Sequence, residues 1–445
     1  MYQFPKDLYT DVRIEETDRT SFFVKNGDVE SDTATSVTGA IIRVYDGTMW
    51  YTGTTNDIAG IQAEIDNLAT LATPNPDILK DPVVAAFEVH KDTVLRFEGE
   101  NDVRKVPREK TRELILTYLD ECVDKSIPEL RLYTGGYNSA HLKKQFYSSK
   151  GAAIVQDMQY CTMSIFYNFT VNAITTEGGK YYTELSFDRL LNRTDEIIAE
   201  RDRYLDYARN AVDVVPGDYT CVLSPVVTAM FTHESFGHKS EADFMLNDKA
   251  LQDEWEMGKK VGNEKVTIRD VGDLPNHGYT PYDDEGTKAR GVCLIDKGIL
   301  TGRLHDAKSA TTLGEALTGN ARAESYLYTP MVRMTNTYIE GGSDDPEEMI
   351  KEIKDGIYVY QVNYGTGMST FTMQPSLCYR IRDGKICEPI RANVVTGNVF
   401  KTLFDIDAIG TDFELFDTYV CGKNGQSAPV SAGGPSIRVK TLTVN

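Results

Sequence analysis

The chain has 445 residues, of which 41% are hydrophobic, 26% charged and 10% aromatic. These proportions exclude an intrinsically disordered chain, and the length predicts more than one domain. The net charge of −20, from 47 basic and 67 acidic residues, disfavours direct binding to the phosphate backbone of a nucleic acid.

The first half of the sequence alternates between strand and helix patterns. β-Branched and aromatic residues over 38–55 predict a hairpin that turns at Asp46. Apolar residues at helical spacing predict a helix over 110–125, and residues 150–188 have the pattern of a strand meander. A long charged helix is expected from about 194 to 212.

A Pro-Gly-Asp break that begins at Pro216 predicts a domain boundary at about residue 215. Beyond it, short strands and glycine-rich turns outnumber helices, which is typical of an α+β protein rather than of a βαβ array. The sequence therefore predicts two domains. An N-terminal domain over 1–215 mixes helices and strands, and a strand-rich C-terminal domain over 216–445 carries a helix with the residues described next.

The cysteines and the start of the chain bear on its location. Seven scattered cysteines are typical of free thiols rather than of a secreted disulfide framework. The first residues show no basic segment followed by an apolar stretch, and no apolar run is long enough to cross a membrane. We therefore expect a cytoplasmic protein with neither a signal peptide nor a membrane partner.

The most distinctive segment is HESFGH at 233–238, in which two of the six histidines bracket a glutamate. Two imidazoles suit Zn²⁺, and the carboxylate of Glu234 can take a proton from water that the metal activates. Ser224 and Pro225 precede the segment as helix-start signals, so the motif is expected on a helix. The alternative is a pair of surface histidines that bind nothing.

The spacing of the two histidines is unusual for a helix. At about 100° per residue, His233 and His238 point about 140° apart in a regular α-helix and cannot share one ion. A single π-type turn would bring them together, and such turns occur mostly at functional sites. Gly237 has no side chain that could obstruct the turn. We therefore predict a π-bulge between the two histidines.

A catalytic zinc site needs a third protein ligand and an open position. Cys421 is the strongest candidate, because it lies in a turn-rich loop beside a glycine, whereas the other cysteines lie in apolar patterns typical of buried thiols. Without a metal, Cys421 and a histidine could instead form a cysteine hydrolase. Other candidates for the third ligand are Glu241, Asp243, His277, His305 and the acidic run Asp283, Asp284 and Glu285.

Four segments resemble, in order, those of the TldD/PmbA family of metalloproteases, historically labelled modulators of DNA gyrase. They are HESFGHKSEADF at 233–244, DDEGT at 283–287, GNARAESYLYTPMVRMTNTY at 319–338 and CGKNGQSAPVSAGGPSIRV at 421–439. The resemblance is strong over roughly residues 220–445 and loose before them. One departure is Ala242, where many members have glycine.

This resemblance implies two α+β domains, with the metal site in the C-terminal one. It implies that His233, His238 and Cys421 are zinc ligands and that Glu234 is the general base, as in the TldD-type catalytic subunit. Members form homodimers, or heterodimers with a related chain that lacks the motif. The expected function is a zinc-dependent peptidase that acts on peptides or unfolded polypeptide segments. A non-catalytic adaptor of the same family is the alternative from a different class.

Overall fold

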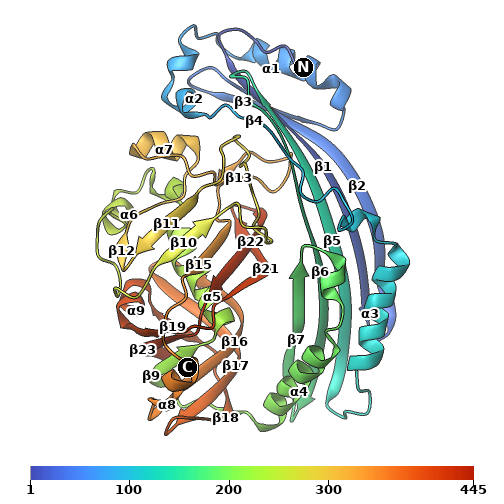
Figure 1. Cartoon of the computed structure of the whole chain (residues 1–445), viewed down its shortest axis with the longest axis vertical. Helices are drawn as coiled ribbons and strands as arrows, with labels where there is room; N and C mark the ends of the chain where they lie inside the picture. The colour runs from blue at the N-terminus through green and yellow to red at the C-terminus, as the bar shows by residue number, and fades with distance from the viewer. Residues whose placement is uncertain (1) are drawn as a thin grey trace.

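The computed structural model describes residues 2–445, except for the side chains at 418 and 419. Long curved strands from the N-terminal half run along one side of the molecule, and the shorter C-terminal strands fill the other (Figure 1). The mixed α+β character is therefore confirmed. None of the helices formed by residues 2–445 combines the length and apolar character needed to cross a membrane.

The N-terminal half builds one seven-stranded sheet, in the order β3-β2-β1-β5-β6-β4 with β7 paired to β6. Strands β2 and β3 form the expected hairpin, and Asp46 stabilises its turn by accepting the N–H groups of Thr48 and Met49, both at 2.8 Å. The strands of this sheet are β1 (Tyr9–Lys25), β2 (Asp28–Tyr45), β3 (Trp50–Thr55), β4 (Lys91–Val94), β5 (Leu130–Ser148), β6 (Ala153–Val171) and β7 (Ile174–Glu184).

Helices cover parts of this sheet. Helix α3 (Arg108–Cys122) packs on β5 and β6, and buries Ile115 and Leu119, which lie at the apolar helical spacing seen in the sequence. Helix α4 (Thr194–Asn210) packs on β6 and β7 and ends two residues before the predicted limit. Two shorter helices, α1 (Ile61–Leu71) and α2 (Pro82–Ala86), lie near the end of the sheet that holds β3 and β4 (Figure 1).

The C-terminal half contains two larger sheets. One has the strand order β12-β11-β10-β15-β22-β21, and the other β16-β9-β23-β19-β17-β18-β8 with β20 paired to β23. The first comprises β10 (Ile268–Val271), β11 (Gly291–Asp296), β12 (Ile299–Leu300), β15 (Asn336–Ile339), β21 (Glu414–Lys423) and β22 (Gln426–Gly434). The second comprises β8 (Val212–Asp213), β9 (Gly217–Leu223), β16 (Asp355–Gly367), β17 (Thr370–Arg382), β18 (Lys385–Arg391), β19 (Val395–Asn398), β20 (Ile406–Ile409) and β23 (Ile437–Val444).

Smaller elements complete this half. Strands β13 and β14 pair with each other, outside the two larger sheets. The bounds of these elements are α6 (Lys249–Glu254), α7 (Ala307–Leu313), α8 (Pro346–Lys351), α9 (Val399–Asp405), β13 (Ala321–Arg322) and β14 (Met331–Val332).

Helix α5 (Pro225–Thr232) packs against both large C-terminal sheets, through β15 and β22 on one side and β9 and β16 on the other. It begins where the sequence predicts, because the Ser224 hydroxyl accepts the N–H of Val227 and Pro225 occupies the first turn. Val227 and Phe231 are fully buried, as a helix between two sheets requires. The helix therefore has a fixed position, and the residues that follow it inherit that position.

Candidate metal centre

The helix that carries the histidine motif changes type at His233. Helix α5 ends at Thr232, residues His233–Gly237 form one π turn, and a 3-10 turn follows over His238–Ser240. The N–H of His238 donates to the carbonyl of His233, five residues earlier. The predicted π-type turn is confirmed. It brings the two imidazoles together, with ring centroids 5.1 Å apart.

Gly237 is needed here for a reason that the sequence does not reveal. Its backbone has φ −56° and ψ −60°, which any residue can adopt. A Cβ at this position would lie only 1.8 Å from the sulfur of Met334, a fully buried side chain. Glycine therefore lets Met334 pack directly against the π turn.

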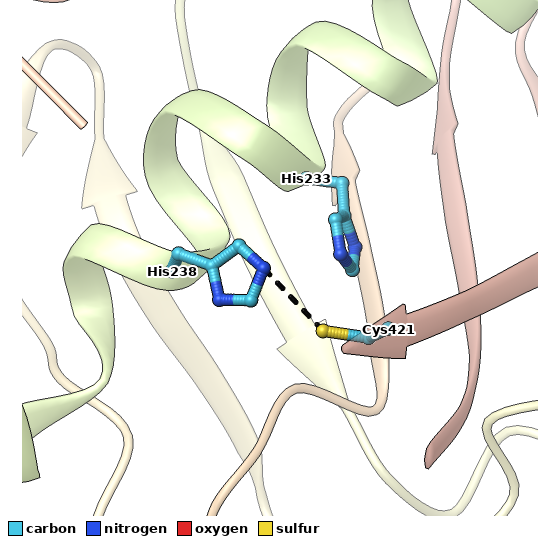
Figure 2. Close-up of side chains that lie close together, drawn as sticks. All are labelled: His233, His238 and Cys421. Carbon is cyan, nitrogen blue, oxygen red and sulfur yellow. Dashed lines mark hydrogen bonds between the residues drawn. The ribbon is translucent and has the colours of Figure 1, made fainter. Parts of the chain in front are cut away.

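Cys421 reaches the histidines from β21. Its Sγ lies 3.4 Å from Nε2 of His238, and the possible ligand atoms of His233, His238 and Cys421 all lie within 4.8 Å of one another. Both imidazoles and the thiol are turned toward one point (Figure 2). Two histidines of one short segment and a cysteine far away in the sequence thus form one group that can hold a metal ion.

The expected loop around Cys421 is wrong. The residue lies within strand β21, and the turn follows only at Asn424 and Gly425, whose φ angles are 49° and 75°. Gly422 does not serve a close approach either, since nothing lies within 4 Å of a Cβ built there. The position of the thiol is set instead by pairing in the hairpin, where Cys421 lies opposite Ala428.

Glu234 is half-buried beside this group. Its burial raises the pKa of the carboxyl, and the nearby imidazoles of His233 and His238 act in the opposite direction. Two glycines of β16 allow the strand to approach it: a Cβ at Gly365 would lie 3.2 Å from Cγ of Glu234, and one at Gly367 would lie 2.8 Å from its carbonyl oxygen. The backbone of β16 therefore forms a wall of the site.

The three side chains have charges suited to cation binding. Burial opposes ionisation of the thiol, but hydrogen bonds from His233 and His238 outweigh it and lower the pKa of Cys421 to about 5. Burial also disfavours a charged His238, yet the thiolate and Glu241 raise its pKa to about 10. A metal ion would take the place of the imidazolium proton, because metal ligands are a thiolate and neutral imidazoles. Two imidazoles and one thiolate fit Zn²⁺ and leave a fourth position open.

Glu241 contacts the candidate ligand His238 on the side of its ring that faces away from Cys421. Its Oε2 is 3.0 Å from Nδ1 of His238 and 3.2 Å from Nζ of Lys423. Glu241 is fully buried, which opposes ionisation, but His238 and Lys423 lower its pKa below the usual range. A carboxylate on Nδ1 fixes the orientation of the ring and leaves Nε2 toward Cys421. Asp243 is paired with Lys423 at 2.7 Å and supports the same arrangement.

The sequence does not predict that Lys423 and Arg333 belong to the site. A signal for Lys423 was available, because residues i and i+2 of a strand share a face and Lys423 follows Cys421 by two. Arg333 lies in the family-like segment 319–338, but no local pattern there marks it as a site residue. It is fully buried and donates to the carbonyls of Cys421 and Gln426. The two cations thus hold the end of β21 from both its side chain and its backbone.

The remaining candidate ligands lie elsewhere. His305 hydrogen-bonds Glu315 at 2.8 Å, and the main-chain N–H of His277 donates to Asp417 at 3.2 Å. The acidic run 283–285 connects the two halves of the chain, where Asp284 pairs with Lys144 at 2.7 Å. The structure therefore brings His233, His238 and Cys421 together with Glu234 and keeps these other residues away.

Family models and relatives match most of the chain. A model of the PmbA/TldA metallopeptidase C-terminal domain matches residues 216–445, and one of domain 1 matches residues 10–72. A metalloprotease of Methanothermobacter thermautotrophicus is 30% identical over 454 residues, which cover 98% of this chain and 95% of that protein. A protein named zinc metalloprotease TldD homolog from Saccharolobus solfataricus is 32% identical over 348 residues, 77% of each chain.

Two solved structures share the fold. A modulator of a DNA gyrase from Thermotoga maritima matches with a TM-score of 0.80 at 18% identity, over 98% of this chain and 96% of that one. TldE from Thermococcus kodakarensis matches with a TM-score of 0.75 at 15% identity and the same coverage. At these identities the structures support the fold alone. The family models and the curated relatives go further, and they show that this chain belongs to the PmbA/TldD metallopeptidase family.

Proposed function

We propose that this chain is a zinc-dependent peptidase that hydrolyses peptides or unfolded polypeptide segments. The observation that carries the proposal is the group formed by His233, His238 and Cys421 beside the carboxylate of Glu234. Two histidines and a cysteine form a ligand set suited to catalytic zinc, with a fourth position left for water or substrate. The name zinc metalloprotease, carried by the Saccharolobus relative, supports the choice of metal.

The metal and the side chains around it have separate roles in hydrolysis. When bound, Zn²⁺ supplies Lewis-acid chemistry that polarises the scissile carbonyl and makes water more acidic. Glu234 accepts a proton from the attacking water and passes it to the leaving nitrogen, so that the C–N bond breaks to give a carboxylate and an amine. Burial raises the pKa of Glu234, which makes it a stronger base. Glu241 keeps His238 in the tautomer that presents Nε2 to the site.

A cysteine hydrolase has one observation in its favour. Sγ of Cys421 lies 3.4 Å from Nε2 of His238, and a pKa of about 5 makes the thiol an anion at neutral pH. That mechanism leaves the second histidine and Glu234 without a role, whereas zinc hydrolysis uses all four residues. A non-catalytic adaptor would need none of them. The peptidase with zinc is therefore the function that the geometry supports best.

Metal content and activity, measured on the same preparations, separate these functions. We expect purified protein to hydrolyse unfolded peptides, to lose this activity on dialysis against a chelator, and to regain it with one zinc ion per chain. Activity that withstands the chelator but is abolished by iodoacetamide would instead support a cysteine hydrolase. Zinc-loaded protein that binds unfolded peptides and cleaves none of them would support an adaptor.

We also propose that the chain acts in the cytoplasm, as a homodimer or as a heterodimer with a related chain. The motif segments shared with the family support the dimer. In the part of the chain that the structure describes, all seven cysteines are free, which supports a reducing compartment. Light scattering after gel filtration tests the assembly. A particle near 49.7 kDa that is fully active alone would contradict it.

A further inference from the structure

A cavity of about 620 Å³ lies at the end of α5 opposite the metal centre. Strands β7 and β6 with helix α4 line it from the N-terminal half, and β16, β17, β21 and the start of α5 line it from the C-terminal half. Figure 1 shows β7 and α4 on the side of the N-terminal half that faces β16. The residues of the metal centre do not line this cavity, so the two are separate features of the fold.

The lining combines aromatic rings with carboxylates. Tyr204, Tyr358 and Tyr360 are among six aromatic residues that line the cavity. Three glutamates line it against a single lysine, Lys180. Aromatic faces attract organic cations, and this attraction strengthens where water is excluded. The cavity therefore favours a ligand with an alkyl stem and a positive charge. The three glutamates are Glu177, Glu200 and Glu414.

Glu200 is the buried member of this set. Its side chain is only 7% exposed, and its Oε2 lies 3.5 Å from Nε of Arg203. The guanidinium of Arg203 is itself placed over the ring of Tyr360, 4.2 Å from its centroid. Leaving out the side chains at 418 and 419, no N–H or O–H group of residues 2–445 donates a hydrogen bond to the Glu200 carboxylate. Buried carboxylates normally have such donors, so Glu200 has unused capacity for a cationic ligand.

Two elements lead from this cavity to the metal centre. Ser224 and Pro225 line the cavity at the start of α5, and His233 follows the end of that helix. The eight residues of α5 span about 12 Å, which an extended peptide covers with about four residues. Strand β16 makes the same connection, since Tyr360 lines the cavity and Gly365 packs against Glu234.

We propose that this cavity is a specificity subsite for a lysine or arginine side chain of the peptide substrate, about four residues from the scissile bond. This inference rests on the proposed peptidase function. The aromatic rings hold the alkyl stem and the cation, and Glu200 forms the charged hydrogen bond. A free organic cation offers the same chemistry, but the path along α5 and β16 favours a side chain that belongs to a bound peptide.

Peptide pairs that differ in one residue test the subsite. Each pair carries either arginine or its neutral isostere citrulline, at one of positions two to six from the cleaved bond, on either side. A charged hydrogen bond predicts that arginine raises kcat/KM about tenfold or more near the fourth position and leaves the other positions unchanged. An equal rate for both peptides at every position would overturn the proposal.

Variants assign the preference to the cavity. Glu200→Gln keeps the shape of the side chain and should bring the arginine-to-citrulline ratio close to one. Glu414→Gln, at an exposed position of β21, should lower the ratio partly even if Glu200→Gln fails to fold. Glu30→Gln makes the same charge change on an exposed part of β2 and should leave the ratio intact. A ratio that survives both cavity variants would refute the assignment.

Direct binding separates this inference from the peptidase function. Calorimetry with Nα-acetylarginine amide should show saturable binding to the wild type and to Glu234→Gln, and at least tenfold weaker binding to Glu200→Gln. Such binding without any peptide hydrolysis would refute the proposed function and retain a cation site. Peptide hydrolysis without such binding would refute the subsite alone. Spermidine that binds there while no peptide position shows a preference would assign the cavity to a free cation and overturn the substrate subsite.

Discussion

The contact between Gly237 and Met334 makes a steric prediction for the metal centre. The backbone at Gly237 suits alanine, and in a regular helix alanine would be about 1 kcal/mol more favourable than glycine. The new Cβ would, however, lie 1.8 Å from the Met334 sulfur, whereas carbon atoms in contact lie about 3.5–4.0 Å apart. Relief thus needs a shift of about 2 Å by Met334 or by the π turn. Overpacking of this kind costs about 1–3 kcal/mol.

We therefore expect Gly237→Ala to lower the free energy of unfolding by about 1–3 kcal/mol and to weaken zinc binding. Urea unfolding of the metal-free protein measures the first, and competition with a chromophoric chelator measures the second. Met334→Ala alone removes a fully buried side chain and should cost about 2–5 kcal/mol. In the double variant the clash is gone, so its loss should be smaller than the sum of the two single losses and zinc affinity should recover.

The reasoning would be refuted by a Gly237→Ala protein with wild-type stability and zinc affinity. Additive losses in the double variant would also contradict it, because they would show that the two positions act independently. Gly422→Ala provides the matched control, since a Cβ there meets nothing within 4 Å although the residue adjoins Cys421. It should leave both measurements unchanged.

Four further predictions concern the side chains of the site. Glu234→Gln should retain zinc, measured by metal analysis, and lose about 10²–10⁴-fold in kcat; loss of the metal would contradict its role as base. Cys421→Ser replaces a thiolate by a poor neutral ligand, so zinc affinity should fall and added zinc should partly restore activity. Glu241→Gln should weaken zinc binding about 10–100-fold by freeing the His238 ring; unchanged affinity would exclude a positioning role. In the metal-free protein, the free energy of unfolding should be highest between pH 6.5 and pH 9.0, the ordinary pKa values of histidine and cysteine. The stabilisation from the Cys421 thiolate is lost as the pH falls toward its pKa of about 5. The stabilisation from the His238 imidazolium is lost as the pH rises toward its pKa of about 10. Urea unfolding across this range, with Cys421→Ser for comparison, measures it.

Local signals in the sequence were sufficient to predict the first part of the site. The cap at Ser224, the proline after it and the spacing of five between the histidines are all properties of one short segment. A helix that must bring His233 and His238 together has few solutions, and the π turn is the one found. No distant part of the chain had to be known for that inference.

The third ligand depends on information that is only partly local. Asn424-Gly425 between two strand-like segments is a strong hairpin signal, and both residues have positive φ as a type I′ turn requires. That signal was sufficient to place Cys421 on a strand, yet the glycines around it suggested a loop. Which face of the strand bears the thiol is set by the partner strand and by Arg333, and no local pattern specifies either.

The roles of the acidic residues are the part of the site that a single sequence predicts least well. Glu241 and Asp284 are of similar type and lie in motif segments of equal prominence, and both were candidate ligands. One accepts a hydrogen bond from the His238 ring, whereas the other pairs with Lys144 of the N-terminal sheet. The sequence around a carboxylate does not specify its partner, because its role depends on which cation the fold places beside it.

The register of the β21–β22 hairpin links these observations. Side chains alternate between the faces of a strand, so a slip of one residue would turn Cys421 away from the histidines and put Val420, which is 63% exposed, in its place. The Asn424-Gly425 turn, Arg333 at the Cys421 carbonyl and Lys423 against Glu241 all oppose that slip. Lys423 contacts the same carboxylate that orients His238. The arrangement that fixes the strand and the one that fixes the imidazole are therefore a single network, and the histidines that follow α5 are positioned together with the cysteine of β21.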